Sequence, residues 1–92
     1  MKVTVSYMSQ LKRAVGISQE TVEITPGETV QKLLLDTLCV NMPNLARTIL
    51  GEDGAFRSIL LVFIGDKQAD LDQPYPLNDG DEVTLMFPIA GG

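Results

Sequence analysis

The sequence contains no histidine, and Cys39 is its single cysteine. Histidine is the side chain most used for acid–base work at neutral pH, and with cysteine it supplies most zinc ligands. The lack of both argues against catalysis by this chain's own side chains and against a metal site. A single cysteine also excludes an internal disulfide, as is typical of a reducing compartment. We therefore expect a cytoplasmic protein that is not itself an enzyme.

Basic residues are also scarce, with 7 against 12 acidic residues and a net charge of −5. Contact with nucleic acid needs clustered lysine and arginine, and the longest cluster is Lys12-Arg13. An acidic domain is instead steered toward basic surfaces of other proteins. No apolar run approaches the roughly 18 residues of a membrane span, and the first residues show no signal peptide. We expect neither nucleic acid nor membrane as a partner.

The remaining composition is that of one ordinary globular domain spanning residues 1–92. Hydrophobic residues make up 45% of the chain and charged residues 21%, which excludes a disordered polar segment. There is no tryptophan and only 5% aromatic residues. The core is therefore expected to be mainly aliphatic.

The N-terminal part predicts a β-hairpin followed by a helix. Residues 2–8 and 18–24 alternate between apolar and polar side chains, as half-buried strands do, and residues 9–16 between them suggest a wide turn. Residues 25–41 change to apolar spacings of three and four, with Thr29 as the N-cap of the helix. After Pro43 ends this helix, a short helical segment is expected before Gly51.

The C-terminal part predicts three strands. The strand at 58–64 is apolar on both faces, and a short strand follows at 67–71. The last strand, 82–87, alternates, so that Val83, Leu85 and Phe87 share one face. A mixed sheet packed on one main helix is the economical solution for this order of elements. The order is that of the α+β, ubiquitin-like β-grasp fold, in which the last strand lies beside the first.

Two stretches of the sequence resemble the ubiquitin-like sulfur carriers. "TPGETVQKLL" resembles the start of the ubiquitin-like helix, and "LNDGDEVTLMFPIAGG", residues 77–92, resembles the carriers' ending. That group includes the small subunit of molybdopterin synthase, the thiamine-pathway carrier and a cysteine-synthase-linked carrier. The stretch "FRSILLVFI" is similar to the longer members and favours the molybdopterin and cysteine branches. The turn Gly65-Asp66-Lys67 departs from the asparagine that those relatives often have there.

The resemblance implies chemistry at the C-terminal carboxylate of Gly92. A ubiquitin-activating-type adenylating enzyme, using ATP and Mg²⁺, would form an acyl-adenylate there, and a sulfur donor would displace AMP to leave a thiocarboxylate. Gly91 and Gly92 would thread narrow enzyme channels without a Cβ clash. The sulfur would pass to an accepting synthase, such as the large subunit of molybdopterin synthase. This chain itself would bind no cofactor.

Pro88 should end the last strand, which leaves a flexible tail of residues 88–92 with a reach of about 15–18 Å. On the sheet, we expect Ile59, Leu61 and Phe63 to face the helix. The opposite face would then carry a partner-docking patch, formed by Leu60, Val62, Met86, Phe87, Pro88 and Ile89. Alternatively, the loop 72–78 covers that face.

Other polar and reactive residues are expected to be structural. Cys39 has no activating cation in its local sequence and is expected to be a small, half-buried hydrophobic residue. Asp79, Asp81 and Glu82 suit a turn, and they lack the further oxygen ligands of a calcium loop. Two other functions remain open: a protein modifier conjugated to lysines through Gly92, and a β-grasp interaction module with no chemistry at its C-terminus.

Overall fold

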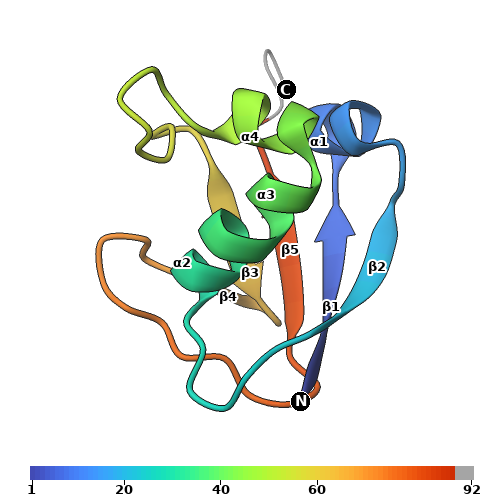
Figure 1. The fold of residues 1–92 in the computed structure, drawn as a ribbon, viewed down its shortest axis with the longest axis vertical. Coiled ribbons are helices and arrows are strands. Elements are labelled where there is room, and N and C mark those ends of the chain that lie inside the picture. Colours follow the sequence, from blue (N-terminus) through green and yellow to red (C-terminus); the bar gives the residue numbers. More distant parts are fainter. Residues whose placement is uncertain (89–92) are drawn as a thin grey trace.

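A computed structural model describes residues 1–88 of the chain. A five-stranded sheet, in the order β2-β1-β5-β3-β4, packs against a layer of helices on one of its faces (Figure 1). Strand β1 pairs in parallel with β5, and the other neighbouring strands are antiparallel. The last strand therefore lies beside the first, and the predicted α+β, ubiquitin-like β-grasp fold is confirmed. The strands are β1 Lys2–Tyr7, β2 Gln19–Glu23, β3 Leu61–Ile64, β4 Lys67–Gln68 and β5 Glu82–Met86.

The predicted wide turn between the first two strands is a helix, α1 Ser9–Val15. Leu11 anchors this helix in the core with no exposed surface. Gly16 ends it at φ 83°, a left-handed conformation that favours glycine, and donates its N–H to the Lys12 carbonyl at 2.8 Å. Seven residues are too few for an isolated helix, so burial of Leu11 is needed to stabilise the segment.

The main helix runs from Val30 to Asn41 in three consecutive parts. They are α2 Val30–Lys32, the π-helical η1 Leu33–Leu38 and α3 Cys39–Asn41. The Thr29 hydroxyl accepts the Lys32 N–H at 3.2 Å, as predicted for its N-cap. Pro43 occupies the first turn of the next helix, α4 Pro43–Ile49, where its missing N–H costs nothing.

The hydrophobic core lies between the sheet and the helices. It is almost wholly aliphatic, as the composition predicts, with Tyr7 and Phe87 as its buried aromatic residues among those described. The Tyr7 hydroxyl donates to the Glu20 carboxylate at 2.5 Å. Burial, then the hydrogen bond to Glu20 and its negative charge, raise the pKa of Tyr7. The residues with no exposed surface are Val5, Leu11, Val30, Leu33, Leu34, Leu45, Ile49, Val83 and Leu85.

Strand β3 faces the opposite way from the prediction. Val62 and Ile64 point into the core, while Leu61 and Phe63 lie on the outer face of the sheet. A turn precedes the strand, in which the Leu60 N–H donates to the Arg57 carbonyl, and the pairing of Val62 with buried Leu85 then sets the inward face. In an entirely apolar stretch the sequence fits either alternation, and a shift by one residue exchanges the two faces.

The loop after β4 covers the start of the main helix. The Val30 N–H donates to the Tyr75 carbonyl at 2.9 Å, and the Leu77 N–H donates to the Glu28 carbonyl at 2.9 Å. The alternative in which residues 72–78 cover the outer face of the sheet is therefore wrong.

Candidate functional site

The end of strand β5 is held in place by its neighbours in the centre of the sheet. The strand lies between β1 and β3, and the Met8 N–H donates to the Leu85 carbonyl at 3.1 Å. Phe87 follows with 7% of its surface exposed, so apolar burial fixes the chain as far as this residue. Pro88 is exposed and offers no N–H for strand pairing. The sheet and the core thus hold the chain in place as far as Phe87, and Pro88 prevents further strand pairing.

The other predicted residues of this end lie outside the part of the chain that the structure describes. They are Ile89 of the docking patch and Gly91 and Gly92 of the proposed reaction. Their roles remain predictions from the sequence.

The outer face of the sheet carries an apolar patch, but its members differ from those predicted. We define the outer patch as Leu61, Phe63 and Met86, all partly exposed. Leu61 is paired with Met86, and Phe63 with Thr84, so the patch spans β3 and β5. The helices all lie on the other face, so none of them covers these side chains (Figure 1). An uncovered apolar surface next to the end of β5 is typical of a protein interface.

Three residues of the predicted docking patch are instead buried in the core. Leu60 is 6% exposed, Val62 1% and Phe87 7%. These residues cannot provide a docking surface in the folded protein, and that prediction is wrong for them. Met86 and Pro88 do lie at the surface near the end of β5.

Pairing with β5 identifies the correct face of β3. Val83 and Leu85 are unambiguously inward because they alternate with polar residues. Directly paired residues of antiparallel strands share a face, and Val62 is paired with Leu85. Once β3 is paired with β5 in this register, Leu61 and Phe63 must be outward.

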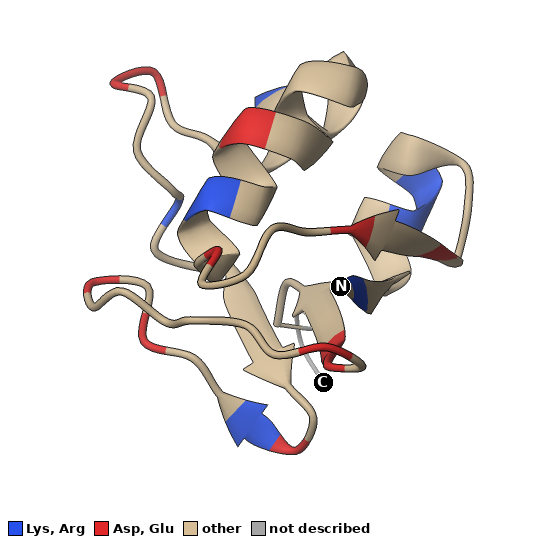
Figure 2. Ribbon diagram, turned by 60° about the horizontal axis from the view of Figure 1, so that its bottom comes forward, with Lys and Arg blue, Asp and Glu red and all other residues tan. Residues whose placement is uncertain are grey.

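Charged residues are distributed unevenly between the two ends of strand β5. Helix α1, which contacts β5, carries Lys12 and Arg13 in its last turn. At the opposite end, Asp66 lies in the β3–β4 turn, and Asp79 and Asp81 lie in the turn before β5. Figure 2 brings that end forward and shows its acidic turns in red. Lys2 and Lys67 also lie at that acidic end, at the starts of β1 and β4. Lys12 and Arg13 place basic charge near the end of β5, although the whole chain is acidic.

Cys39 has the character of a core residue. It lies on α3 and is buried, and this burial raises the pKa of its thiol. A buried thiol with a raised pKa stays protonated at neutral pH and is a poor nucleophile. Cys39 is more deeply buried than the half-buried position predicted, and the geometry gives no support to sulfur transfer through this thiol.

The acidic residues before β5 form a turn. Asp79 accepts the Lys2 N–H at 2.7 Å, and Asp81 accepts the Asn78 N–H at 2.8 Å. Within residues 1–88, no group of three or more side chains is arranged to hold a metal ion. The helices of the same residues include none with the length and hydrophobicity needed to span a membrane.

The relationship to known proteins follows from residues 5–92, which match the model of the ThiS family. This chain belongs to the ThiS family. The family is one of small ubiquitin-like sulfur carriers, so the predicted resemblance is confirmed. Its members carry sulfur rather than catalyse reactions, in agreement with the expectation that this chain is not an enzyme. A comparison with curated protein sequences found no match.

Several solved structures are similar to this chain in fold. SAMP1 from Haloferax volcanii is 25% identical, with a TM-score of 0.89 and 100% of each chain covered. A putative molybdopterin converting factor, subunit 1, from Pyrococcus furiosus is 21% identical, with a TM-score of 0.72 and coverage of 97% and 99%. The BexX/CysO complex of Amycolatopsis orientalis gives 23% identity, a TM-score of 0.71 and coverage of 98% and 99%. The last two likenesses establish the fold of this ThiS-family chain.

Proposed function

We propose that this protein carries sulfur as a thiocarboxylate on its C-terminal residue, Gly92. The observation that carries the proposal is the family match, which extends through residue 92 and therefore includes the Gly91-Gly92 ending. Strand β5 supports it, because burial of Leu85 and Phe87 in a central strand holds the chain in place as far as Phe87.

The reaction needs two displacement steps. A carboxylate oxygen of Gly92 attacks the α-phosphorus of ATP, pyrophosphate leaves, and an acyl-adenylate forms. A hydrosulfide equivalent from a sulfur donor then attacks the carbonyl carbon and expels AMP, which leaves the thiocarboxylate. ATP and Mg²⁺ belong to the adenylating partner. The carrier contributes the carboxylate, and its glycines contribute a backbone with no Cβ atoms to obstruct entry into an enzyme channel.

The outer patch supplies the docking surface in this proposal. Leu61, Phe63 and Met86 are partly exposed beside the strand that leads to Gly92. A partner that covers them would be held close to the end of β5, so that docking brings the partner to the strand that precedes the reacting residue. The same surface would serve the adenylating enzyme and the sulfur-accepting synthase in turn. We propose the molybdopterin or cysteine branch for that synthase, because solved neighbours include a putative molybdopterin converting factor and a CysO complex.

The test is intact-mass measurement after co-expression with a matched adenylating enzyme and a sulfur donor. The expected product is the full chain with one oxygen replaced by sulfur, and deletion of Gly92 should abolish the change while leaving the circular-dichroism spectrum intact. The Cys39→Ser variant is the matched control and should still be converted. If the wild type is never converted, or if the change depends on Cys39, the proposal is refuted.

Protein modification is a second candidate, favoured by the likeness over the full length to SAMP1, described as a small archaeal modifier protein. Here Gly92 would form an isopeptide bond with a target lysine. The last basic residue is Lys67, so trypsin would leave residues 68–92 as the branch on a modified lysine. An Ala90→Arg variant would shorten that branch to Gly-Gly, which mass spectrometry detects on target peptides. If neither branch appears in cells that express the protein, this candidate fails.

The third alternative, an interaction module without C-terminal chemistry, is separated by extending the chain. One residue added after Gly92 blocks both carboxylate reactions but leaves a docking module unaffected. Partner binding measured with and without the added residue therefore distinguishes loss of chemistry from loss of docking.

A further inference from the structure

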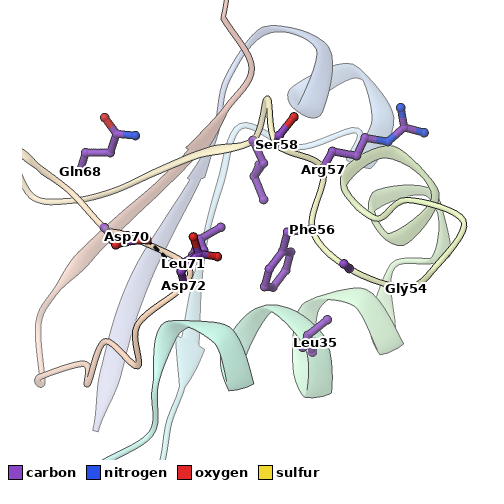
Figure 3. A pocket seen from close by; sticks show the side chains of 12 residues that line it. Leu35, Gly54, Phe56, Arg57, Ser58, Gln68, Asp70, Leu71 and Asp72 are labelled. Carbon is purple, nitrogen blue, oxygen red and sulfur yellow. Dashed lines mark hydrogen bonds between the residues drawn. The ribbon is translucent and has the colours of Figure 1, made fainter.

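A groove of about 760 Å³ lies on the helix side of the molecule, between the main helix and the edge of the sheet (Figure 3). Leu35 of η1 forms one side, and residues 54–58 form the second. Residues 68–72, which include the end of β4, form the third. The outer patch lies on the opposite face of the sheet. A partner in this groove therefore leaves the outer patch free.

Hydrogen bonds hold both loop walls of the groove. On one side the Gly51 N–H donates to the Ala55 carbonyl at 2.8 Å, and the Arg57 N–H donates to the Ile49 carbonyl at 2.8 Å. On the other side the Gln31 amide donates to the Leu71 carbonyl at 3.2 Å. The walls are thus tied to α4 and α2, and binding would not first require the loops to be ordered.

The inside of the groove is apolar. Leu35 is 39% exposed although its neighbours on the same helix, Leu33 and Leu34, are completely buried. Phe56 and Leu71 are partly buried against the core, and in Figure 3 their side chains face the same space as Leu35. Three separate elements therefore direct large apolar side chains toward one hollow.

The charge at the groove is negative. Asp70 and Asp72 line it and are exposed, and the Asp70 carboxylate accepts the Asp72 N–H at 2.9 Å. Arg57 is the basic residue of the lining. Its Nε donates to the Leu50 carbonyl at 3.3 Å, and Figure 3 shows its guanidinium directed away from the hollow. A ligand with a positive charge next to an apolar group complements this arrangement.

We propose that this groove binds a segment of a partner protein in which apolar side chains lie next to lysine or arginine. The apolar side chains lie against Leu35, Phe56 and Leu71, and the cation lies beside Asp70 and Asp72. The proposal concerns a second surface and does not depend on the reaction of Gly92.

The experiment uses two blocked hexapeptides, one of alternating leucine and lysine and one of alternating leucine and glutamate. Each is titrated into the full-length ¹⁵N-labelled protein, and amide shifts are mapped by NMR. We expect the lysine peptide to shift residues 54–58 and 68–72, with binding that weakens as salt increases, and the glutamate peptide to leave them unchanged.

Two matched pairs of variants test the contacts. The double variant Asp70→Asn/Asp72→Asn should weaken binding of the lysine peptide about tenfold. The control is the double variant Glu23→Gln/Asp66→Asn, which removes the same negative charge away from the groove and should have little effect on binding. Leu35→Ala should also weaken binding, whereas Val40→Ala, at a 69% exposed position on the same helix, should not.

Several results would overturn the proposal. They are equal binding of both peptides, shifts confined to the outer patch, or no shifts at millimolar peptide. Groove shifts that depend on protein concentration without peptide would assign the groove to a second copy of this chain, and would also overturn it. Sulfur loading is measured separately, so a failure of the peptide to bind leaves the proposed function standing. In the same way, a failure of sulfur loading leaves the groove proposal standing.

Discussion

Replacing Val62 and its neighbour Leu61 with alanine, one at a time, separates the two faces of strand β3. Val62 is 1% exposed and packs in the core, whereas Leu61 is partly exposed beside Met86. The fold therefore predicts that Val62→Ala lowers stability and that Leu61→Ala lowers partner docking. The two substitutions differ by one position in the chain, which makes each the control for the other.

The size of the first effect follows from burial. Val62→Ala removes two methyl groups worth about 0.8 kcal/mol each in transfer free energy, and the cavity left behind raises the total to about 2 kcal/mol. With a urea m-value of about 1 kcal/mol/M, the unfolding midpoint falls by about 2 M. Leu61→Ala loses only part of its contacts, and the expected loss is about 1 kcal/mol or less.

Because the chain has no tryptophan, urea unfolding is best followed by far-ultraviolet circular dichroism. Docking is measured as the initial rate of sulfur loading by the adenylating enzyme, at a temperature where both variants are folded. We expect Leu61→Ala to load several-fold more slowly than wild type and Val62→Ala to load normally. Equal losses of stability in the two variants would refute the assignment of faces. Normal loading of Leu61→Ala would refute docking at the outer patch.

Three further predictions concern single side chains. Tyr7→Phe should abolish a loss of stability at alkaline pH. Because the pKa of Tyr7 is raised in the folded protein, its contribution to the free energy of unfolding is complete below the unfolded pKa of about 10 and declines above it. In the wild type this decline is about 1 kcal/mol between pH 10 and 11. The variant's urea midpoint should fall less over that range, and parallel curves would contradict this. Cys39 should react with a thiol reagent far more slowly in the native protein than in urea, because burial raises the pKa of its thiol. Equal rates in the two conditions would show that the thiolate is accessible in the folded protein and would contradict its burial. Thr29→Ala should lower the free energy of unfolding by about 1 kcal/mol through loss of the bond from the Lys32 N–H, with Thr29→Ser as the control that keeps it.

The sequence alone predicted those elements whose signals are local. Alternation in residues 2–8 and 82–87 identified the two central strands and their inward faces, since polar and apolar residues there are clearly separated. Thr29 marked the start of the main helix because a hydroxyl at that position caps it. The element order then indicated the β-grasp fold, and the Gly91-Gly92 ending indicated the family.

Tertiary structure decided the features for which local signals are absent or ambiguous. Helix α1 is too short to be stable alone and forms because Leu11 enters the core. The inward face of β3 was set by pairing with β5, because residues 59–64 are apolar at every position and fit either alternation. The groove brings Leu35, Phe56 and Leu71 together from distant parts of the chain.

The sequence by itself determined the family, the order of the strands and the main helix, and the residue expected to react, because these depend on local pattern and on the C-terminal motif. Only the tertiary structure decided which side chains of β3 reach the surface and which residues line the groove. The physical reason is that burial belongs to a side chain's neighbours in space. An apolar stretch specifies that burial occurs, and the paired strand determines which side chains are buried.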